Sequence, residues 1–407
     1  MTGPLTDMET AREAGPRILV GHAGGRDTEP QARSLVETGP GAFACPDDAR
    51  ELAALPDALV WVGGPADGLP PAFAVLRERA RAARIALPLV IVGDRMPAGF
   101  DVRAADVIVP GTCPPTVLQE RIAEAVRQSL RMEEARLRRS AFGRDPFAPD
   151  TKPLLPEEDA ARRTRIPVLV AGNGSRIAAA LSGGLSAIEL VGCLTPDAAL
   201  ARLGEHPFRM LVADLPEARA LELVAALRRD PRHIALPVMV LAEGQPAAAA
   251  LLEASASDVV TSTAPDDELG ARCRMLLRSG ARRHLAGACL SRYRASGPRV
   301  RAELPHDAFE HYLAALRRVL AFRGGEPHLL RLDEIDVATP PMAADNDDPF
   351  AAAIGNPVRS AALAASRDED FVARVAEIGD VALVRNRQAL ERIERRIAAI
   401  VASTSFA

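Results

Sequence analysis

Short apolar runs alternate with amphipathic stretches along the first two thirds of the chain, and the whole alternation occurs twice. The first cycle has apolar runs at residues 17–20, 58–62, 87–92 and 106–109. The second has them at residues 167–170, 210–213, 236–241 and 258–260. Short strands that alternate with helices predict doubly wound α/β domains with parallel sheets.

The chain of 407 residues is long enough for three domains, each with its own core. We expect the two α/β domains over residues 15–140 and 166–285, with a proline-rich, charged linker over 141–165. Apolar residues recur at helical spacing from about residue 266 to residue 294, which predicts a helix leading out of the second domain. Residues 286–407 then form a third domain.

Composition and charge remove several classes of function. The hydrophobic fraction is 48% but aromatic residues make up only 3%, so the cores consist mainly of Ala, Leu, Val and Ile. The formal net charge is -4, which offers no overall attraction for polymeric nucleic acid or an anionic membrane. We expect neither a signal peptide nor a transmembrane helix. The five cysteines have no metal-binding spacing and suit a reducing cytoplasm. We expect no metal and no cofactor.

Both α/β segments resemble response-regulator receiver domains, which are flavodoxin-like. A working receiver needs an acidic pair after its first strand to hold Mg²⁺, an Asp at the end of the third strand, and a later Thr or Ser and a Lys. The first segment has His22-Ala23 in place of the acidic pair and Val62-Gly63 in place of the Asp. The chemistry of phosphoryl transfer is therefore missing from the first segment.

The second segment keeps one part of this machinery. Asp214 stands at the phosphoacceptor position, but Gly172-Asn173 replace the acidic pair, and Ala242 and Ser262 replace the Thr and the Lys. The only lysine of the chain, Lys152, lies in the linker, so neither segment can have its lysine. We interpret both as pseudo-receivers used for packing and dimer contacts, with Asp214 a vestigial phosphoacceptor.

The third domain resembles GGDEF diguanylate cyclase domains, in a degenerate and truncated form of α+β, nucleotidyl-cyclase-like fold. Residues 304–313 look like the family's first helix, and residues 329–333 look like its first central strand, with Asp333 at the first metal-binding position. Residues 350–356 align with a segment whose guanine-reading acid is here Ala353. The chain then passes through one hairpin and one helix, 387–401, so the family's last strands are missing.

The signature itself is degenerate, since the family's five residues are here Ala376, Glu377, Ile378, Gly379 and Asp380. In the family, two glycines let the hairpin backbone approach a triphosphate. Ala376 and Glu377 add a methyl group and a negative charge at those two positions. The resemblance therefore implies that cyclisation is lost and that there are no catalytic residues.

Arg367 and Asp370, three residues apart, keep a different kind of chemistry. A guanidinium can donate to the two acceptors of a guanine, and a carboxylate can accept from its N–H groups. The pair stands five residues before the degenerate signature, as in the inhibitory RxxD site of GGDEF domains, which binds cyclic di-GMP. That site recruits a further Arg from the corresponding helix, which implies Arg395 or Arg396 here.

The order receiver, receiver, GGDEF is the layout of PleD-type regulators, and the inactive signature beside an RxxD is similar to PopA-type cyclic di-GMP effectors. The resemblance implies a non-catalytic, cytoplasmic receptor, a homodimer recruited to a cell pole, with protein partners in a signalling or proteolysis-adaptor pathway linked to the cell cycle. Two alternatives remain open. One is an active, divergent cyclase that uses Asp333 with Glu377 or Asp380, and the other is a ligand-free scaffold.

Overall fold

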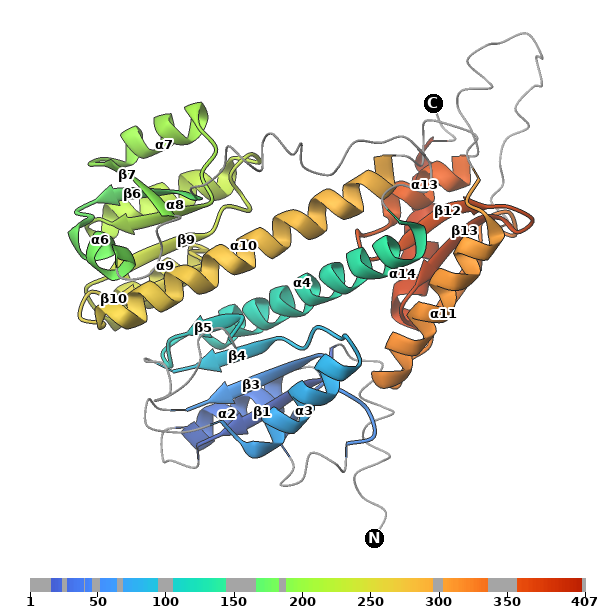
Figure 1. The fold of residues 1–407 in the computed structure, drawn as a ribbon, viewed down its shortest axis with the longest axis horizontal. Coiled ribbons are helices and arrows are strands. Elements are labelled where there is room, and N and C mark those ends of the chain that lie inside the picture. The colour runs from blue at the N-terminus through green and yellow to red at the C-terminus, as the bar shows by residue number, and fades with distance from the viewer. Residues whose placement is uncertain are drawn as a thin grey trace.

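The computed structural model describes residues 16–23, 28–39, 41–45, 52–63, 69–93, 105–143, 166–182, 188–295, 303–335 and 357–404. These residues form two five-stranded parallel sheets and one three-stranded antiparallel sheet (Figure 1). Most of the predicted linker, including Lys152, and the predicted segment 350–356 lie outside the described residues. None of the described helices is both long and apolar enough to cross a membrane.

The first unit, residues 16–143, is a parallel sheet in the order β2-β1-β3-β4-β5 with helices on both faces. Its strands are β1 (Ile18–His22), β2 (Ala42–Ala44), β3 (Ala58–Val62), β4 (Leu89–Val92) and β5 (Val107–Val109). Helices α2 (Thr28–Thr38) and α4 (Pro115–Phe142) cover one face, and α3 (Pro71–Ala82) covers the other. Because both faces are covered, β3 and β4 are buried at every position.

The second unit, residues 166–295, repeats this plan in the order β7-β6-β8-β9-β10. Its strands are β6 (Ile166–Gly172), β7 (Ile188–Cys193), β8 (Met210–Asp214), β9 (Val238–Ala242) and β10 (Asp258–Thr261). One face packs on α7 (Pro196–Glu205), α8 (Glu217–Arg229) and α9 (Gln245–Glu253), and the other on α6 (Ser175–Ser182) and α10 (Asp266–Ala295).

Counted along the chain, both units have the strand order 2-1-3-4-5, which is the flavodoxin-like order. The predicted parallel α/β architecture is therefore confirmed. The sequence prediction missed β2 and β7, the outermost strands on one side of each sheet. Both are partly exposed along their length, and so neither has the continuous apolar run of a buried strand.

The described residues of the third unit, 303–335 and 357–404, form a sheet in the order β11-β13-β12 and three helices. Its elements are α11 (His306–Phe322), β11 (His328–Arg331), α13 (Pro357–Ala365), β12 (Phe371–Val375), β13 (Gly379–Val384) and α14 (Arg387–Thr404). Alternate residues of the hairpin strands β12 and β13 enter two different cores. One core contains α11, and the other contains α13 and α14.

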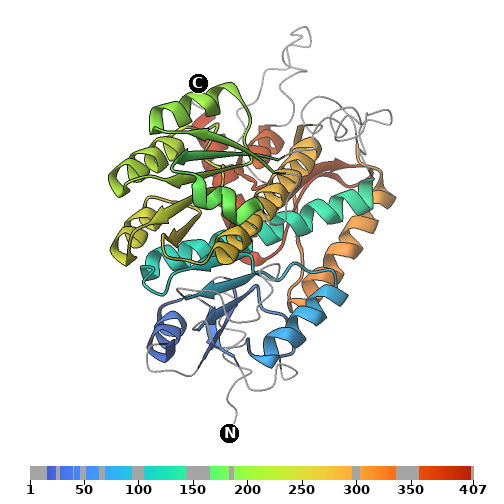
Figure 2. The same cartoon turned by 60° about the vertical axis from the view of Figure 1, so that its left-hand side comes forward.

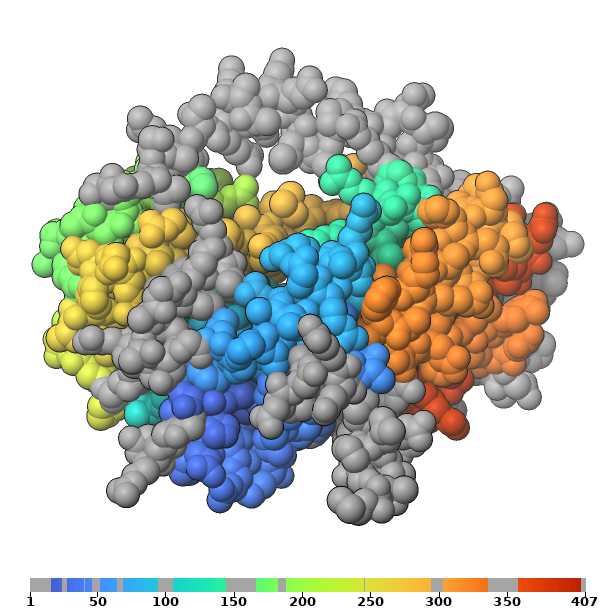
Figure 3. All heavy atoms as spheres, turned by 60° about the horizontal axis from the view of Figure 1, so that its bottom comes forward, coloured from blue at the N-terminus to red at the C-terminus, as the bar shows by residue number. Residues whose placement is uncertain are grey.

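The two longest helices, α4 and α10, lie side by side and carry the first two units to the third (Figures 1 and 2). Their last turns belong to the core that contains α11, where Phe142 and Tyr293 meet Phe371 of β12 and its neighbours. Helix α10 runs through the boundary predicted at 285/286, because its last turns belong to that core. Figure 3 shows the first unit beside both the second unit and the third unit.

Candidate functional site

The four residues Arg367 to Asp370, called here the RxxD turn, connect α13 to β12. Asp370 is only 6% exposed and is fixed by two donors to the same oxygen. The backbone N–H of Arg367 donates to Oδ2 at 2.7 Å, and Nη2 of Arg392 on α14 donates to it at 2.9 Å. The turn thus brings the predicted acid together with an arginine of the last helix.

The α14 arginine on Asp370 differs from the two that the sequence indicated. Arg395 instead donates to the backbone oxygen of Glu391, one turn back on its own helix, at 3.3 Å, and Arg396 is exposed. Arg392 immediately precedes Ile393, a fully buried residue of the apolar stripe, so it lies at the edge of the packed face. The apolar stripe of α14 does not by itself distinguish Arg392 from the other arginines that flank it.

Burial raises the pKa of the Asp370 carboxyl, and the Arg367 N–H and Arg392 oppose that rise. The ionised carboxylate is therefore held in a desolvated position by a small number of donors. Any further N–H donor that reaches this carboxylate would favour its charged form. Such an arrangement suits a ligand that presents N–H groups.

Arg367 has the opposite surroundings, with a side chain that is 51% exposed. Its guanidinium lies 3.9 Å from Oε1 of Glu369, which is a long ion pair. Burial raises the pKa of the Glu369 carboxyl, and nearby Asp370 raises it further. The guanidinium of Arg367 is thus loosely held and accessible, while the acid three residues later is rigid.

Two arginines of α4 hold the RxxD turn from the side of the first unit. Arg131 forms an ion pair of 2.7 Å with Asp368, and Arg138 donates to the backbone oxygens of Asp368 at 3.2 Å and Asp370 at 2.8 Å. The Arg138 guanidinium also lies 5.4 Å from the ring centre of Phe371. Neither arginine was predicted from the sequence, since each lies more than 200 positions before the turn along the chain.

Beside this turn, α4 carries a buried set of charges that we call the central ion cluster. It consists of Glu133 and Glu134 of α4, Arg138 of α4, Arg323 after α11 and Arg385 after β13. Arg385 contacts both glutamates, at 2.6 and 2.9 Å, and Arg323 contacts Glu133 at 3.1 Å. Arg323 also pairs with Asp57 of the first unit at 2.8 Å, so the cluster ties the first unit to the third.

The central ion cluster predicts a loss of stability in acid. Burial opposes ionisation of Glu133 and Glu134, but the surrounding arginines outweigh it and lower the pKa of each carboxyl below 4.5. A carboxyl with a lowered folded-state pKa contributes stability above its unfolded pKa, and this is lost as pH falls through the folded value. Thermal unfolding measured from about pH 7 to about pH 3 should therefore show a drop that begins below about pH 4.5. A Glu134→Gln protein should show a shallower drop, and an equal one would contradict this assignment.

The degenerate signature forms the turn between β12 and β13. Glu377 has a φ of 68° and a side chain that is 83% exposed, so it adopts the left-handed conformation that favours glycine. Asp380 is buried and lies 3.5 Å from Arg359 of α13. The hairpin backbone therefore has, at Glu377, the conformation that glycine adopts most easily. The carboxylate of Asp380 forms an ion pair with Arg359 within the protein.

Asp333, the other acid predicted for metal binding, lies in the turn after β11 and is exposed. It forms an ion pair of 3.5 Å with Arg331, and it is near Gly379 of the hairpin. Among the described residues, no group of three or more His, Cys, Asp or Glu side chains is placed to hold a metal ion.

The second unit places Asp214 at the end of β8, as the sequence predicted. Gly172, at the acidic-pair position, has a φ of 99°, and a Cβ there would come 1.9 Å from the backbone oxygen of Asp214. An acidic residue cannot occupy this position without moving the backbone. Nearby, Arg176 donates to the backbone oxygens of Ser262 and Ala264, closing the side where the lysine of a receiver would lie.

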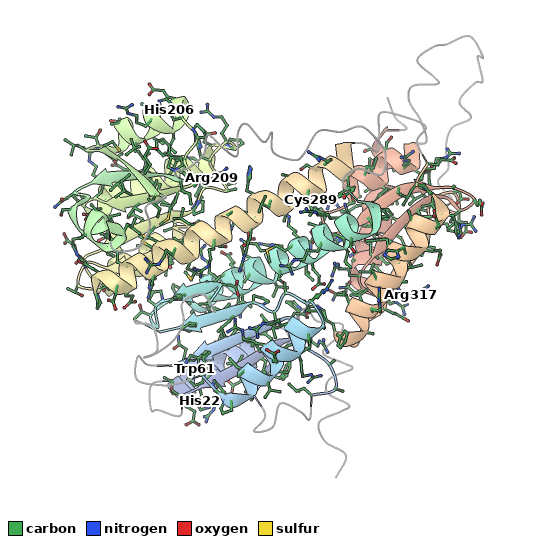
Figure 4. All side chains as sticks on the ribbon, in the orientation of Figure 1. His22, Trp61, His206, Arg209, Cys289 and Arg317 are labelled. Carbon is green, nitrogen blue, oxygen red and sulfur yellow. The ribbon has the colours of Figure 1, made fainter. Side chains whose placement is uncertain are left out.

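In the first unit, His22 and Val62 end two neighbouring strands, β1 and β3. Figure 4 shows His22 and Trp61 in the first unit, far from the third unit. His22 is exposed, and Trp61 is buried against Phe73. An apolar cluster and an exposed imidazole thus stand where a receiver has its acids.

No protein-family model matches the chain, and none of the curated proteins matches it significantly. Solved structures similar to part of it include a response regulator from Chloroflexus aurantiacus, at 23% identity over 28% of this chain and 98% of that one, with a TM-score of 0.26. The chemotaxis response regulator CheY4 of Vibrio cholerae is 17% identical over 28% and 99%, with a TM-score of 0.25. The BeF3-activated DrrB receiver domain is 20% identical over 28% and 98%, with a TM-score of 0.24.

All three are described as response regulators or receiver domains, and each matched length is about that of one α/β unit. The fold class rests on the strand order of the two sheets, which is independent of these alignments. The chain thus contains two α/β units with the flavodoxin-like strand order.

Proposed function

We propose that the protein is a non-catalytic receptor for cyclic di-GMP and that the RxxD turn is its binding site. The observation that carries the proposal is the pairing of an accessible Arg367 guanidinium with a rigid, partly desolvated Asp370 carboxylate. The guanidinium donates to O6 and N7 of a guanine, and the carboxylate accepts from the guanine N–H groups. Arg392 supplies a further positive charge beside the carboxylate, suited to a phosphate.

A titration of the full-length protein with cyclic di-GMP, followed by calorimetry, tests the proposal. We expect saturable binding at micromolar ligand, with GMP at the same concentrations as a control. Because binding favours the ionised form of Asp370, whose pKa is raised, affinity should decrease as pH falls through that raised value. Absence of saturable binding by cyclic di-GMP would leave the RxxD turn as an internal ion pair.

We expect no turnover of GTP by the purified protein with Mg²⁺. The third unit has Ala376 and Glu377 in place of two glycines, and Asp380 is buried in an ion pair with Arg359. The double substitution Ala376→Gly with Glu377→Gly should not restore activity, because it does not change Asp380 or the residues that would bind metal. Chromatographic detection of cyclic di-GMP made from GTP by either protein would favour the divergent cyclase instead.

We further propose that both α/β units are receiver domains that have lost phosphoryl transfer and serve as interaction surfaces. Acetyl phosphate with Mg²⁺ should leave the intact mass unchanged, because Gly172 replaces an acid and Arg176 closes the lysine side of the Asp214 site. Mass spectrometry of the wild type beside Asp214→Asn checks this. A labile gain of one phosphoryl group in the wild type alone would show that Asp214 still functions.

A second candidate function, a scaffold without a ligand, is favoured by the central ion cluster and by the contacts of Arg131 and Arg138 with the RxxD turn. In this reading the turn is a structural joint between the first and third units. Both candidates involve a homodimer, protein partners of a signalling or proteolysis-adaptor pathway, and recruitment to a cell pole. The cyclic di-GMP titration distinguishes them.

A further inference from the structure

A cavity of about 510 Å³ lies among the first unit, the two long helices and the second unit, away from the RxxD turn. Helix α3 and the segment after it supply one wall, and α4 and α10 supply others. Ser257, just before β10, brings the second unit to its edge. Cavities that bind small molecules commonly have volumes of about 300–1,000 Å³.

Positive charge dominates this cavity. Of the described residues that line it, seven are arginines and two are acids, which gives a formal charge of five positive in a chain whose net charge is -4. The arginines are Arg77, Arg81, Arg84, Arg121, Arg136, Arg282 and Arg283. They come from α3, from the turn after it, from α4 and from α10, so the concentration of charge is created by the fold.

The two acids neutralise little of this charge. Asp106 is 3.3 Å from Arg282, and Glu124 is 3.5 Å from Arg283. Glu124 also makes a shorter ion pair, 2.7 Å, with Arg127, which does not line the cavity. Arg81 pairs with Glu78 of its own helix, so the two acids in the lining leave part of the positive charge without a carboxylate inside the cavity.

Several donors in the walls are also unused. The Nε of Arg283 is buried without a hydrogen-bond partner among the described residues. Arg84 and Arg136 are exposed, and within the same described part of the chain their side chains have no hydrogen bond or ion pair. Burial lowers the pKa of the Arg121 and Arg283 guanidinium groups, because removal from water disfavours their charged forms. A bound anion would remove that cost.

The remaining lining is apolar and includes Ile85, Ile108, Met132, Met275 and Leu276. Methionine side chains adapt to flat, polarisable groups and pack well against aromatic rings. The cavity thus combines donors for a multiply charged anion with a surface that suits a base. A nucleotide carries both kinds of group, a charged phosphate and a flat base.

We propose that the cavity between the first unit, α4 and α10 binds a nucleotide through its phosphate groups. Arg84, in the turn after α3, and Arg136, on α4, donate to the phosphates, and the methionine-lined surface takes the base. The bound nucleotide connects α3 and α4 of the first unit to α10 of the second unit. This inference does not depend on the function proposed for the RxxD turn.

Calorimetric titration of the full-length protein with ATP tests the proposal, with inorganic pyrophosphate and adenosine as separate probes. We expect saturable binding of ATP, weaker binding of pyrophosphate and the weakest of adenosine, all compared at one ionic strength. Arg84→Gln and Arg136→Gln should each weaken ATP binding about tenfold, since each removes charge-assisted hydrogen bonds to phosphate. Neither change removes a contact seen within the protein, so both proteins should fold.

Two controls separate this site from other effects. Arg139→Gln alters an exposed arginine of α4 outside the cavity lining and should bind ATP as the wild type does. Arg367→Ala should likewise leave ATP binding unchanged. No saturable binding of ATP or pyrophosphate up to about 1 mM would overturn the proposal. Equal affinity of the wild type, Arg84→Gln and Arg136→Gln for ATP would overturn it as well.

Discussion

Replacing Glu134 with Gln should lower the free energy of unfolding by about 3–5 kcal/mol, the cost typical of breaking a buried ion pair. Glu134 is fully buried, and its carboxylate accepts from Arg138 at 2.7 Å, from Arg385 at 2.9 Å and from the hydroxyl of Tyr312. Glutamine has almost the same shape but no charge. Arg138 would then lose its carboxylate partner, and Arg385 would keep only Glu133, which it shares with Arg323.

Urea unfolding followed by circular dichroism measures this effect, with Glu120→Gln as the matched control. Glu120 lies on the same helix but is exposed, so its replacement should change the free energy by less than about 0.5 kcal/mol. In the Glu134→Gln protein, the unfolding transition of the first and third units should move to a lower urea concentration. If the two variants unfold alike, the central ion cluster contributes little to the joint between these units.

Replacing Arg367 with Ala should weaken cyclic di-GMP binding by roughly ten- to a hundredfold. A bidentate contact between an arginine and a guanine is worth about 1–3 kcal/mol, and each 1.4 kcal/mol is about tenfold in affinity. Because the Arg367 side chain makes only a long ion pair of 3.9 Å with Glu369, the fold should be unaffected. Calorimetry at one ionic strength measures the change, since salt screens phosphate contacts.

Arg387→Ala is the matched control, because Arg387 is an exposed arginine of α14 that pairs with Glu391 on its own helix. Asp370→Ala should also weaken binding, and it should cost stability as well, because Arg392 loses its partner. Arg392→Ala should reduce affinity more than Arg395→Ala or Arg396→Ala. Wild-type affinity in both Arg367→Ala and Asp370→Ala would eliminate the receptor proposal.

The sequence could predict the strands that are buried on both faces, since β3 and β4 are apolar at every position. It could not predict β7, which lies at the edge of its sheet and has exposed residues such as Leu190. Arg367 and Asp370 were proposed from the spacing and from the resemblance of the flanking segments to a known motif, and the structure places both in one local turn. Arg131 and Arg138 were not predictable in this way, because only the docking of α4 on the third unit brings them to that turn.

The choice between Arg392, Arg395 and Arg396 shows a related limit. All three flank the apolar stripe of α14, and a pattern of apolar positions does not determine which flank faces Asp370. That depends on how α14 packs against α13 and β13, which is settled by the volumes of buried side chains. The pattern along this helix therefore did not distinguish the arginine that contacts Asp370 from its neighbours.

Helix α4 begins as the last helix of the first unit and ends in the core of the third, next to Phe371. Recombination that exchanged the third unit for a foreign domain would leave Glu133 and Glu134 in α4 without Arg323 and Arg385. Two carboxylates selected for burial would then face either water or an unrelated surface. The first and third units are therefore expected to have been inherited together.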